Sequence, residues 1–324
     1  MLKYTFKRLL WMIPIVLGVA ILVFTLMTFC PGEPAEIILG PTATQESLDA
    51  LTEELGLNQP FLVRLFTYLR DVFLRFDMGK SWITNVEIMP TIFERLPRTF
   101  LLTIVTMLIS FGLGIPLGVI AATHQNRWQD NLCMLLALIG VSIPNFWLAM
   151  LLVIQFSVEL GWLPPLWSAN GGIACYILPA IAGCMGSLGT CARQTRSSML
   201  DVIRSDYIIT ARSKGVPEGA VVAKHALKNA LIPIITMMGT TFGRLLGGMM
   251  IIETIFAIPG MGTYVITAVN NRDFPIVQGG TIFLAITFSL CMLVVDLLYA
   301  AVDPRIKAQY ASSSKKRKKV SENG

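Results

Sequence analysis

Long apolar stretches separated by polar ones dominate this chain. Each is close to the 20 or so apolar residues that an α-helix needs to cross a bilayer. The stretches are 9–29, 99–122, 132–156, 177–195, 234–256 and 281–301. Strand-like alternation is absent, and lipid offers no partner to unpaired backbone groups, so helices are expected. The pattern predicts an all-α polytopic membrane protein with six transmembrane helices, of which 177–195 is the weakest because it is rich in glycine.

Composition supports a membrane protein. Hydrophobic residues make up 54% of the 324 residues and charged residues 14%, against about 25% charged residues in a typical soluble domain. The first apolar stretch follows Lys3, Lys7 and Arg8, as in a secretory signal peptide. It is longer than the apolar part of a signal peptide, and no small-x-small cleavage site follows. We therefore expect it to remain as the first membrane helix.

The distribution of cations predicts the orientation. Segments 1–8, 123–131, 196–232 and 302–324 together hold 17 Lys and Arg residues, whereas the short loops 157–176 and 257–280 hold one, Arg272. Because cytoplasmic loops carry the excess of positive charge, both termini are expected in the cytoplasm. The net charge of +6 is thus a signal of topology. The basic run at 315–319 fits contact with anionic lipid better than with nucleic acid.

The largest outer element is expected at 30–98. Thr44 opens a helical pattern that Gly56 stops, and a second amphipathic pattern covers 61–76. Both helices should lie on the outer surface or pack on the bundle. Cys30 and Cys175 also lie near the outer face, and the sequence leaves open whether they form a disulfide. No CxxC pair exists, so a redox or zinc site is not expected.

No motif for catalysis or for cofactor binding is convincing. The Gly-Lys-Ser at 79–81 ends like a phosphate-binding loop, but Leu74 stands where that loop needs a glycine. Its predicted location is also outside the cell. The two histidines, His124 and His225, have no ligand cluster around them. We therefore predict a protein that is not an enzyme and has no metal or cofactor.

Glycines repeat every four residues in the fifth span, at Gly239, Gly243 and Gly247. This spacing places them on one helix face, where small residues let another helix approach closely. Close helix packing is the simpler interpretation. A lining for a substrate path is the alternative.

Three ionisable residues lie in or near the spans: Arg244, Glu253 and Asp296. Such residues are costly in lipid and are therefore candidates for function. Glu253 and Asp296 lie close to helix ends, which would let both reach the membrane interface. Arg244 is deeper and needs a partner or a water-filled path. We expect it to line either the pathway or a seam between subunits.

The polar segment 204–233 lies between two apolar spans and is more elaborate than a connector requires. Gly215 is a natural helix stop, and Pro217 with Glu218 suits the first turn of a new helix. Val221, Val222 and Ala226 would then form an apolar patch beside cations. The pattern predicts a short helix across the loop, and docking into a protein groove fits it better than lying on the membrane surface, because its apolar face is small.

This segment resembles the cytoplasmic coupling loop of binding-protein-dependent ABC importer permeases, most closely the dipeptide/oligopeptide branch. Ile-Thr-Ala at 209–211 stands where that loop has Glu-Ala-Ala, and Gly215 follows at the matching spacing. The usual closing Ile-x-Leu-Pro is replaced by HALK at 225–228, and the proline comes later, at Pro233. Further stretches similar to that branch are DMGKS at 77–81, GIPLG at 114–118, SIPNFW at 142–147, GWLP at 161–164, ETIF at 253–256, PGMG at 259–262, DLLY at 296–299 and DPR at 303–305.

The resemblance implies a permease subunit of the type I importer fold in the cytoplasmic membrane of a prokaryote. It implies a second homologous permease subunit, two cytoplasmic ATPase subunits and an extracytoplasmic peptide-binding protein as partners. It divides the chain into 1–94, a permease domain at 95–304 with its coupling loop at 196–232, and a basic tail at 305–324. It also places the coupling helix at about 215–229. The residues expected to contact the ATPases are Asp206, Ala211, Gly215, Val216, Pro217, Glu218, Val221, Lys224, His225 and Asn229.

Two alternatives stay open at this point. Sister systems that carry nickel chelates, glutathione or other small solutes look alike in sequence. A channel or secondary transporter without ATPase partners is a different class. Few carboxylates lie in the spans for ion coupling, which does not favour that class.

Overall fold

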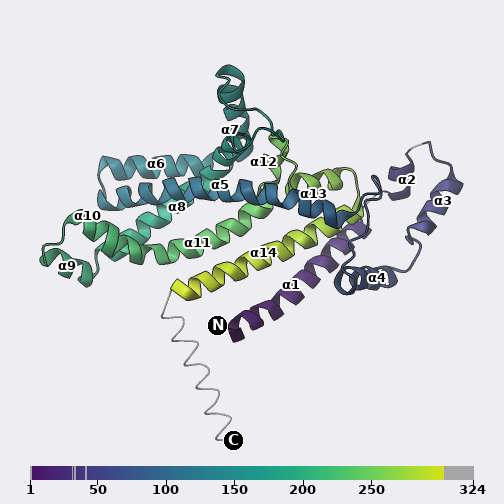
Figure 1. The fold of residues 1–324 in the computed structure, drawn as a ribbon, viewed down its shortest axis with the longest axis horizontal. Helices are drawn as coiled ribbons and strands as arrows, with labels where there is room; N and C mark the ends of the chain where they lie inside the picture. Colours follow the sequence, from purple (N-terminus) through teal and green to yellow (C-terminus); the bar gives the residue numbers. More distant parts are fainter. Residues whose placement is uncertain (1, 31, 33, 41, 303–324) are drawn as a thin grey trace, which may run out of the picture.

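The computed structural model describes residues 2–30, 32, 34–40 and 42–302, and that part of the chain is built from helices (Figure 1). The expected basic tail at 305–324 lies outside the described residues. The helices are α1 (Leu2–Thr28), α2 (Pro34–Leu39), α3 (Gln45–Glu54), α4 (Phe61–Leu74), α5 (Ile88–Thr123), α6 (Trp128–Ser142), α7 (Asn145–Leu152), α8 (Ala174–Ile203), α9 (Asp206–Ser213), α10 (Glu218–Ala220), α11 (Leu227–Gly248), α12 (Met250–Ile255), α13 (Met261–Asn270) and α14 (Phe274–Val302), with π-helical segments η1 (Val153–Glu159) and η2 (Val221–Ala226).

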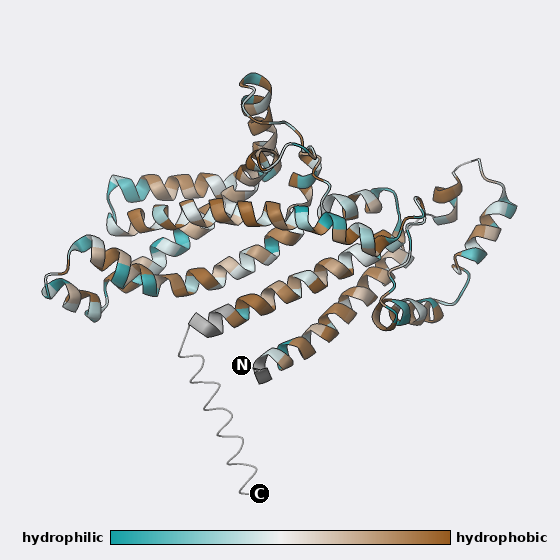
Figure 2. Cartoon of the chain, in the orientation of Figure 1, coloured by the Kyte–Doolittle hydropathy of each residue, from teal (hydrophilic) through white to brown (hydrophobic). Residues whose placement is uncertain are grey.

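Five of the six predicted spans are long apolar helices, formed by α1, α5, α8, α14 and the continuous helix Glu218–Gly248. Figure 2 shows apolar residues along most of these helices and polar ones at their ends. The third predicted span, 132–156, is wrong as a single helix. It is broken into α6 and a second piece, Asn145–Glu159, that turns 98° away from it.

The break follows from Pro144. The residue before a proline is pushed out of the α-helical region, and Ile143 has extended backbone angles. Pro144 is the N-cap residue of α7, where its missing N–H removes no hydrogen bond of the helix. In Figure 1, α7 stands out from the bundle.

Helix α8 is the centre of the bundle, with two-thirds (67%) of its apolar window buried against α5, α6 and α11. Its glycines explain why it looked weak in the sequence. A side chain at Gly189 would collide with the backbone of Ala137 in α6, and α5 approaches α8 through Gly114 and Gly118. Small residues that lower the hydropathy of a span thus permit its close packing.

The glycines of α11 divide into two kinds. A side chain at Gly239 would overlap Val295 of α14, and one at Gly243 would overlap Phe288 of the same helix. Gly247 meets nothing and faces open space. Gly239 and Gly243 therefore serve packing within the chain, whereas Gly247 does not.

The outer part of the chain folds as the sequence predicts. Thr44 caps α3 by accepting a hydrogen bond from the Ser47 N–H, and Gly56 follows that helix with φ +66°. Helix α4 covers most of the second predicted pattern. Both lie at the outer end of the molecule, to the right in Figure 1. Cys30 and Cys175 are free thiols.

The Gly-Lys-Ser loop has a structural role. The Ser81 hydroxyl, which is buried, donates a hydrogen bond to Asp273, and the Trp82 N–H donates to the same carboxylate at 3.2 Å. Ser81 also accepts from the N–H of Thr84 at 2.9 Å. Asp273 directly precedes α14, so these bonds fix the loop to the start of the last helix.

Candidate functional site

A short helix and a turn lie at the cytoplasmic end of the bundle. Helix α9 begins after Ser205 and is followed by Gly215, whose φ of +78° is in the left-handed region that favours glycine. Pro217 then starts a new helix. Across the turn, Arg212 and Glu218 form an exposed ion pair at 2.6 Å. We call residues 206–229 the elbow.

The elbow differs from the predicted short helix at 215–229. The separate short helix is α9, which lies before Gly215. From Glu218 the chain runs as one helix to Gly248, through the π-helical η2. Pro233 does not break it, and no other stop signal interrupts it. The helix that follows the turn is therefore the beginning of a membrane span.

The predicted apolar docking patch is also wrong. Val221 and Ala226 are completely buried. They pack with Ile208 of α9 and Met199 of α8, so they anchor the elbow to the bundle. The large apolar side chains that α9 exposes are Tyr207 and Ile209.

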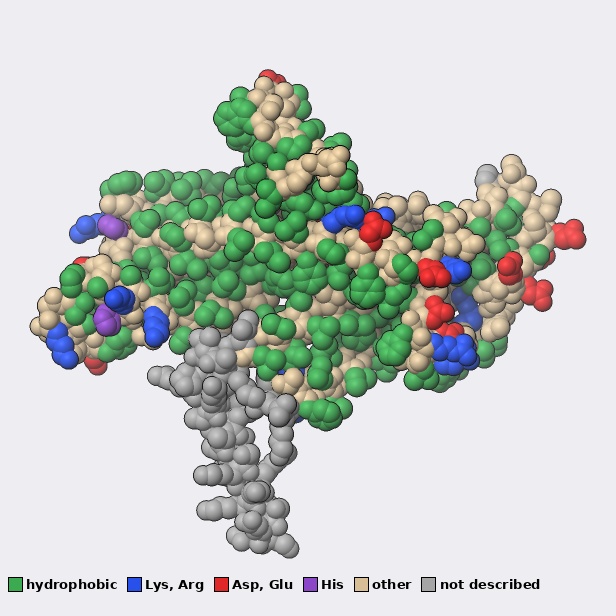
Figure 3. Space-filling model, viewed as in Figure 1, with side chains coloured by type: hydrophobic (Ala, Val, Ile, Leu, Met, Phe, Trp, Pro, Cys, Tyr) green, Lys and Arg blue, Asp and Glu red, His purple; other side chains and the backbone are tan. Residues whose placement is uncertain are grey.

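The other elbow residues expected to contact a partner lie around these two side chains. Tyr207 is held in place by Asn229, whose amide nitrogen donates to its hydroxyl at 2.9 Å. Ala211 and Val216 are half-buried. The exposed elbow residues include Asp206, Arg212, Lys214, Gly215, Pro217, Glu218, Lys224, His225, Lys228 and Asn229. In Figure 3, basic side chains and histidine gather at this end of the molecule.

A buried ion pair near this end was missed by the sequence analysis. Arg196 of α8 donates two hydrogen bonds, at 2.6 and 2.7 Å, to Asp130 of α6. The Asn126 N–H also donates to Asp130 at 2.9 Å. The Asp130 side chain is only 3% exposed. The sequence could have indicated this pair, because Asp130 stands at the start of one predicted span and Arg196 at the end of another.

Arg244 lies on a polar stripe of α11 rather than in the apolar core. It is exposed in the single chain, together with Thr236 and Thr240. Its guanidinium donates a hydrogen bond to the Ser187 hydroxyl of α8 at 3.3 Å. An arginine at the centre of a membrane helix costs about 2.5–3.5 kcal/mol on insertion scales when it faces lipid. The stripe is therefore expected to face protein or water.

Glu253 does not reach the membrane interface, contrary to the expectation from the sequence. Its side chain is 0% exposed. Its carboxylate accepts hydrogen bonds from the Thr99 hydroxyl at 2.6 Å and from the Thr263 N–H at 2.9 Å. Thr99 in turn accepts from the Met261 N–H at 2.8 Å. Glu253 thus satisfies the free N–H groups at the start of α13 and ties them to α5.

The turn that encloses Glu253 requires glycine. A side chain at Gly260 would overlap the Glu253 carboxylate, and one at Gly262 would crowd both that carboxylate and the backbone of Met250. The Pro-Gly-Met-Gly stretch therefore forms a close cover over a buried acid.

Asp296, unlike Glu253, is paired with a cation: Arg8 of α1 lies 2.9 Å from its carboxylate.

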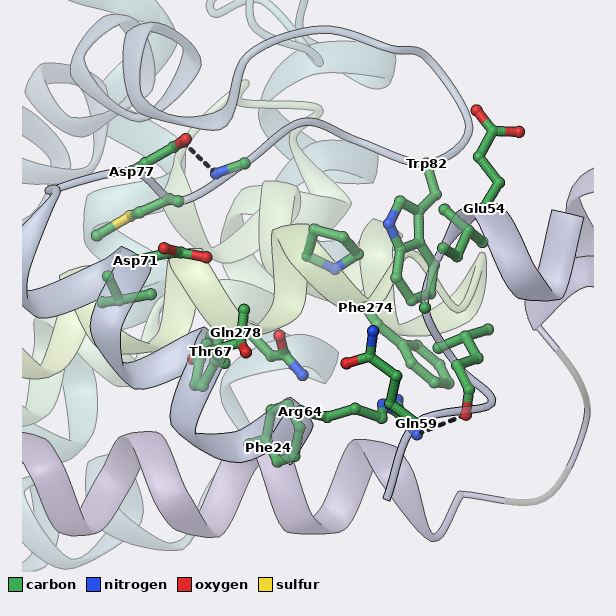
Figure 4. Close-up of a pocket in the computed structure, with 18 residues that line it drawn as sticks. Phe24, Glu54, Gln59, Arg64, Thr67, Asp71, Asp77, Trp82, Phe274 and Gln278 are labelled. Atoms are coloured by element: carbon green, nitrogen blue, oxygen red, sulfur yellow. Dashed lines mark hydrogen bonds between the residues drawn. The ribbon is translucent and has the colours of Figure 1, made fainter. Parts of the chain in front are cut away.

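A hollow of about 380 Å³ lies at the outer end, between α1, α4 and the start of α14. Figure 4 shows Arg64, Gln59 and Gln278 directed into this space. Arg64 also donates to the Leu57 carbonyl at 3.5 Å. Burial lowers the pKa of Arg64 and raises that of the Tyr68 hydroxyl.

Comparison with known proteins settles the family. The model of the binding-protein-dependent transport system inner membrane component matches residues 114–308, and the model of its N-terminal part matches residues 1–103. The chain belongs to this family. The dipeptide transport system permease protein DppB of Alkalihalophilus pseudofirmus is 43% identical, with 95% of this chain and 100% of that protein covered.

Other similar permeases are named for different transported compounds. A putative peptide transport system permease protein of Brucella abortus is 44% identical over 93% of this permease and 98% of the relative. The glutathione transport system permease protein GsiC of Salmonella typhimurium is 43% identical over 95% of this permease and 99% of the relative. The chain is a permease of a peptide-type ABC importer and a multi-pass protein of the bacterial inner membrane.

Solved structures confirm the fold. Two inward-facing structures of the MetNI methionine ABC transporter match with TM-scores of 0.53 and 0.57, at 19% and 18% identity. They cover 66% and 67% of this permease, and 97% and 98% of the matching chains. The permease is the non-catalytic inner membrane component of a binding-protein-dependent transport system.

Proposed function

We propose that this permease forms the path by which an ATP-driven importer carries dipeptides and short oligopeptides into the cell. The observation that carries the proposal is the 43% identity to a dipeptide permease over 95% of this chain. Glutathione, itself a peptide, is the strongest alternative cargo, because a glutathione permease is equally similar.

The proposed assembly contains a second homologous permease subunit, two cytoplasmic ATPases and an external peptide-binding protein. The elbow is the proposed contact with an ATPase. Its exposed Tyr207 and Ile209 supply apolar area, and the surrounding cations can pair with acids of the partner. This combination of an apolar centre and a charged rim is typical of a specific interface.

Movement of the ATPases would reach the membrane through the elbow. Ile208 of α9 is completely buried among residues of α8 and η2. Because η2 continues into α11 without a break, a displacement of α9 would also displace this membrane span. Closely packed interiors transmit displacements rather than absorb them. We propose this route for switching the pathway between its inward-open and outward-open forms.

Uptake by cells in which this importer is the sole peptide route would test the cargo. Labelled dialanine, glutathione and a nickel chelate would be supplied separately, with a strain lacking this permease as the control. Peptide uptake that disappears with the permease supports the proposal. Selective loss of glutathione or nickel uptake instead would reassign the cargo.

Purification of the tagged permease in mild detergent would test the assembly. We expect a second permease and two ATPase subunits to accompany it. Transport in liposomes that contain this chain alone would contradict the proposed machinery and favour a channel or secondary transporter.

A further inference from the structure

The polar stripe of α11 runs from the cytoplasmic part of this membrane span toward its middle. Thr236, Thr240 and Arg244 are four residues apart and share one exposed face. From Ile232 to Arg244 the helix rises about 18 Å at 1.5 Å per residue. That places the guanidinium roughly halfway or more across a hydrocarbon core of about 30 Å. Arg244 thus lies well inside the membrane span, while Thr236 lies near its cytoplasmic end.

The charge of Arg244 is not neutralised within the described part of the chain. The ion pairs found there involve other arginines, and the hydrogen bond of Arg244 is to the neutral hydroxyl of Ser187. An arginine at this depth requires a counter-charge, a polar neighbour or water. Arg244 therefore faces a polar space that this chain alone does not close.

The two helices that carry Arg244 and Ser187 leave open surface at nearby glycines. Side chains built at Gly186, Gly247 or Gly248 would meet no atom within 4 Å. Gly186 adjoins Ser187, and Gly247 and Gly248 lie one turn beyond Arg244 on the same helix. This contrasts with Gly239 and Gly243, which α14 fills. A hollow of about 420 Å³ lies along the cytoplasmic part of the stripe, where it is lined by Thr236 and Thr240 together with Gln194, Ile232, Pro233 and Met237.

The threonines offer a second kind of contact. Their hydroxyl protons are used locally, because Thr236 donates to the Ile232 carbonyl at 3.3 Å and Thr240 to the Met237 carbonyl at 3.0 Å. Their oxygen lone pairs stay available to an N–H group. Thr240 lies about 6 Å below Arg244 along the helix. One end of the stripe thus attracts an anion and the other accepts hydrogen bonds.

We propose that Arg244 and Thr240 form a cargo subsite, in which the guanidinium binds the carboxylate of the passing peptide and the hydroxyl accepts from its amide or ammonium group. The planar guanidinium matches a carboxylate with two parallel hydrogen bonds. This inference rests on the proposed peptide path. It requires only a free carboxylate, which dipeptides and glutathione share.

Thiol labelling would test whether the stripe is accessible and whether Arg244 attracts anions. Thr240→Cys would be introduced into a chain whose native cysteines are replaced by serine, and the assembled importer in membrane vesicles would be treated with an anionic or a cationic methanethiosulfonate. We expect the anionic reagent to be favoured, with the preference falling at least fivefold when Arg244→Gln is added. Arg127→Gln, at an exposed cytoplasmic position, is the matched control and should leave the preference unchanged.

Transport would test the role in recognition. With the binding protein saturated with labelled dialanine, we expect Arg244→Gln to reduce the maximal uptake rate at least tenfold. Arg244→Lys, which keeps the charge but not the bidentate geometry, should retain an intermediate rate. Unlabelled dialanine should slow the labelling of Thr240→Cys, and Arg244→Gln should abolish that protection.

The outcomes separate the subsite from the pathway. If Thr240→Cys reacts with neither reagent, the stripe is not part of an aqueous path and the proposed function itself loses its path. If it reacts but the preference and uptake are unchanged in Arg244→Gln, only the carboxylate subsite is overturned. Loss of the second permease from purified Arg244→Gln complexes would assign Arg244 to a subunit seam and would also overturn the subsite.

Discussion

Replacing Glu253 by alanine should destabilise the permease markedly. The substitution leaves the Thr99 hydroxyl and the Thr263 N–H without their acceptor in a fully buried place. Each unsatisfied buried donor costs about 1–3 kcal/mol. The cavity adds roughly 1 kcal/mol at about 24 cal/mol per Å³. Relief of the desolvation of the buried carboxylate offsets part of this cost, so the net loss should be about 3 kcal/mol.

The melting temperature of the detergent-solubilised permease provides the assay. About 2–4 °C per kcal/mol applies to chains of 150–250 residues, so a fall of at least about 5 °C is expected. Glu253→Gln keeps one acceptor oxygen, so its melting temperature should lie between those of the parent and of Glu253→Ala. The matched control is Glu94→Ala, because Glu94 is exposed and its pair with Arg98 contributes about 0.5 kcal/mol or less. A melting temperature of Glu253→Ala within about 1 °C of the parent would refute the reasoning.

Three further substitutions address other parts of the chain. Asp130→Asn breaks the ion pair with Arg196 and should lower the free energy of unfolding by about 2–3 kcal/mol, seen as a lower melting temperature. An unchanged melting temperature would show that this ion pair contributes nothing to stability. Gly239→Leu forces a side chain into Val295, so overpacking should cost about 1–3 kcal/mol and reduce the yield of folded permease in size-exclusion chromatography. Gly215→Trp should strain the turn by about 1–2 kcal/mol, because Gly215 has a positive φ. The new side chain would point into open space, so we expect intact membrane insertion but at least tenfold slower peptide uptake. Normal uptake would contradict the coupling role of the elbow.

Much of the fold could be predicted because each membrane helix must satisfy its own backbone. Apolar length located five spans, and the pair of Thr44 and Gly56 located α3. The bend at Pro144 could not be predicted with the same certainty, because many membrane helices continue through a proline when neighbours compensate. Pro233 of α11 does so in this chain.

The candidate site was harder to predict because it depends on which face of a helix turns inward. Val221 and Ala226 are apolar at helical spacing, which suits a docking face and a buried anchor equally. The packing of Ile208 against them decides for the anchor. The roles of Glu253 and Asp130 depend on partners more than sixty residues away in the sequence, and no local pattern reports such contacts.

The right-angled arm formed by α7 and η1 has a consequence for the surrounding lipid. Helix α6, with 15 residues, rises about 22 Å from the cytoplasmic boundary, short of the roughly 30 Å of a hydrocarbon core. Because the arm turns 98° from α6, we expect it to run along the plane of the bilayer at the depth of the outer leaflet, with apolar side chains such as Phe146, Trp147 and Ile154 exposed in the single chain. It adds cross-sectional area to one leaflet and none to the other. We therefore expect bilayer thickness and lateral pressure in the outer leaflet to act on this permease through the arm, in a way that a straight span would not allow.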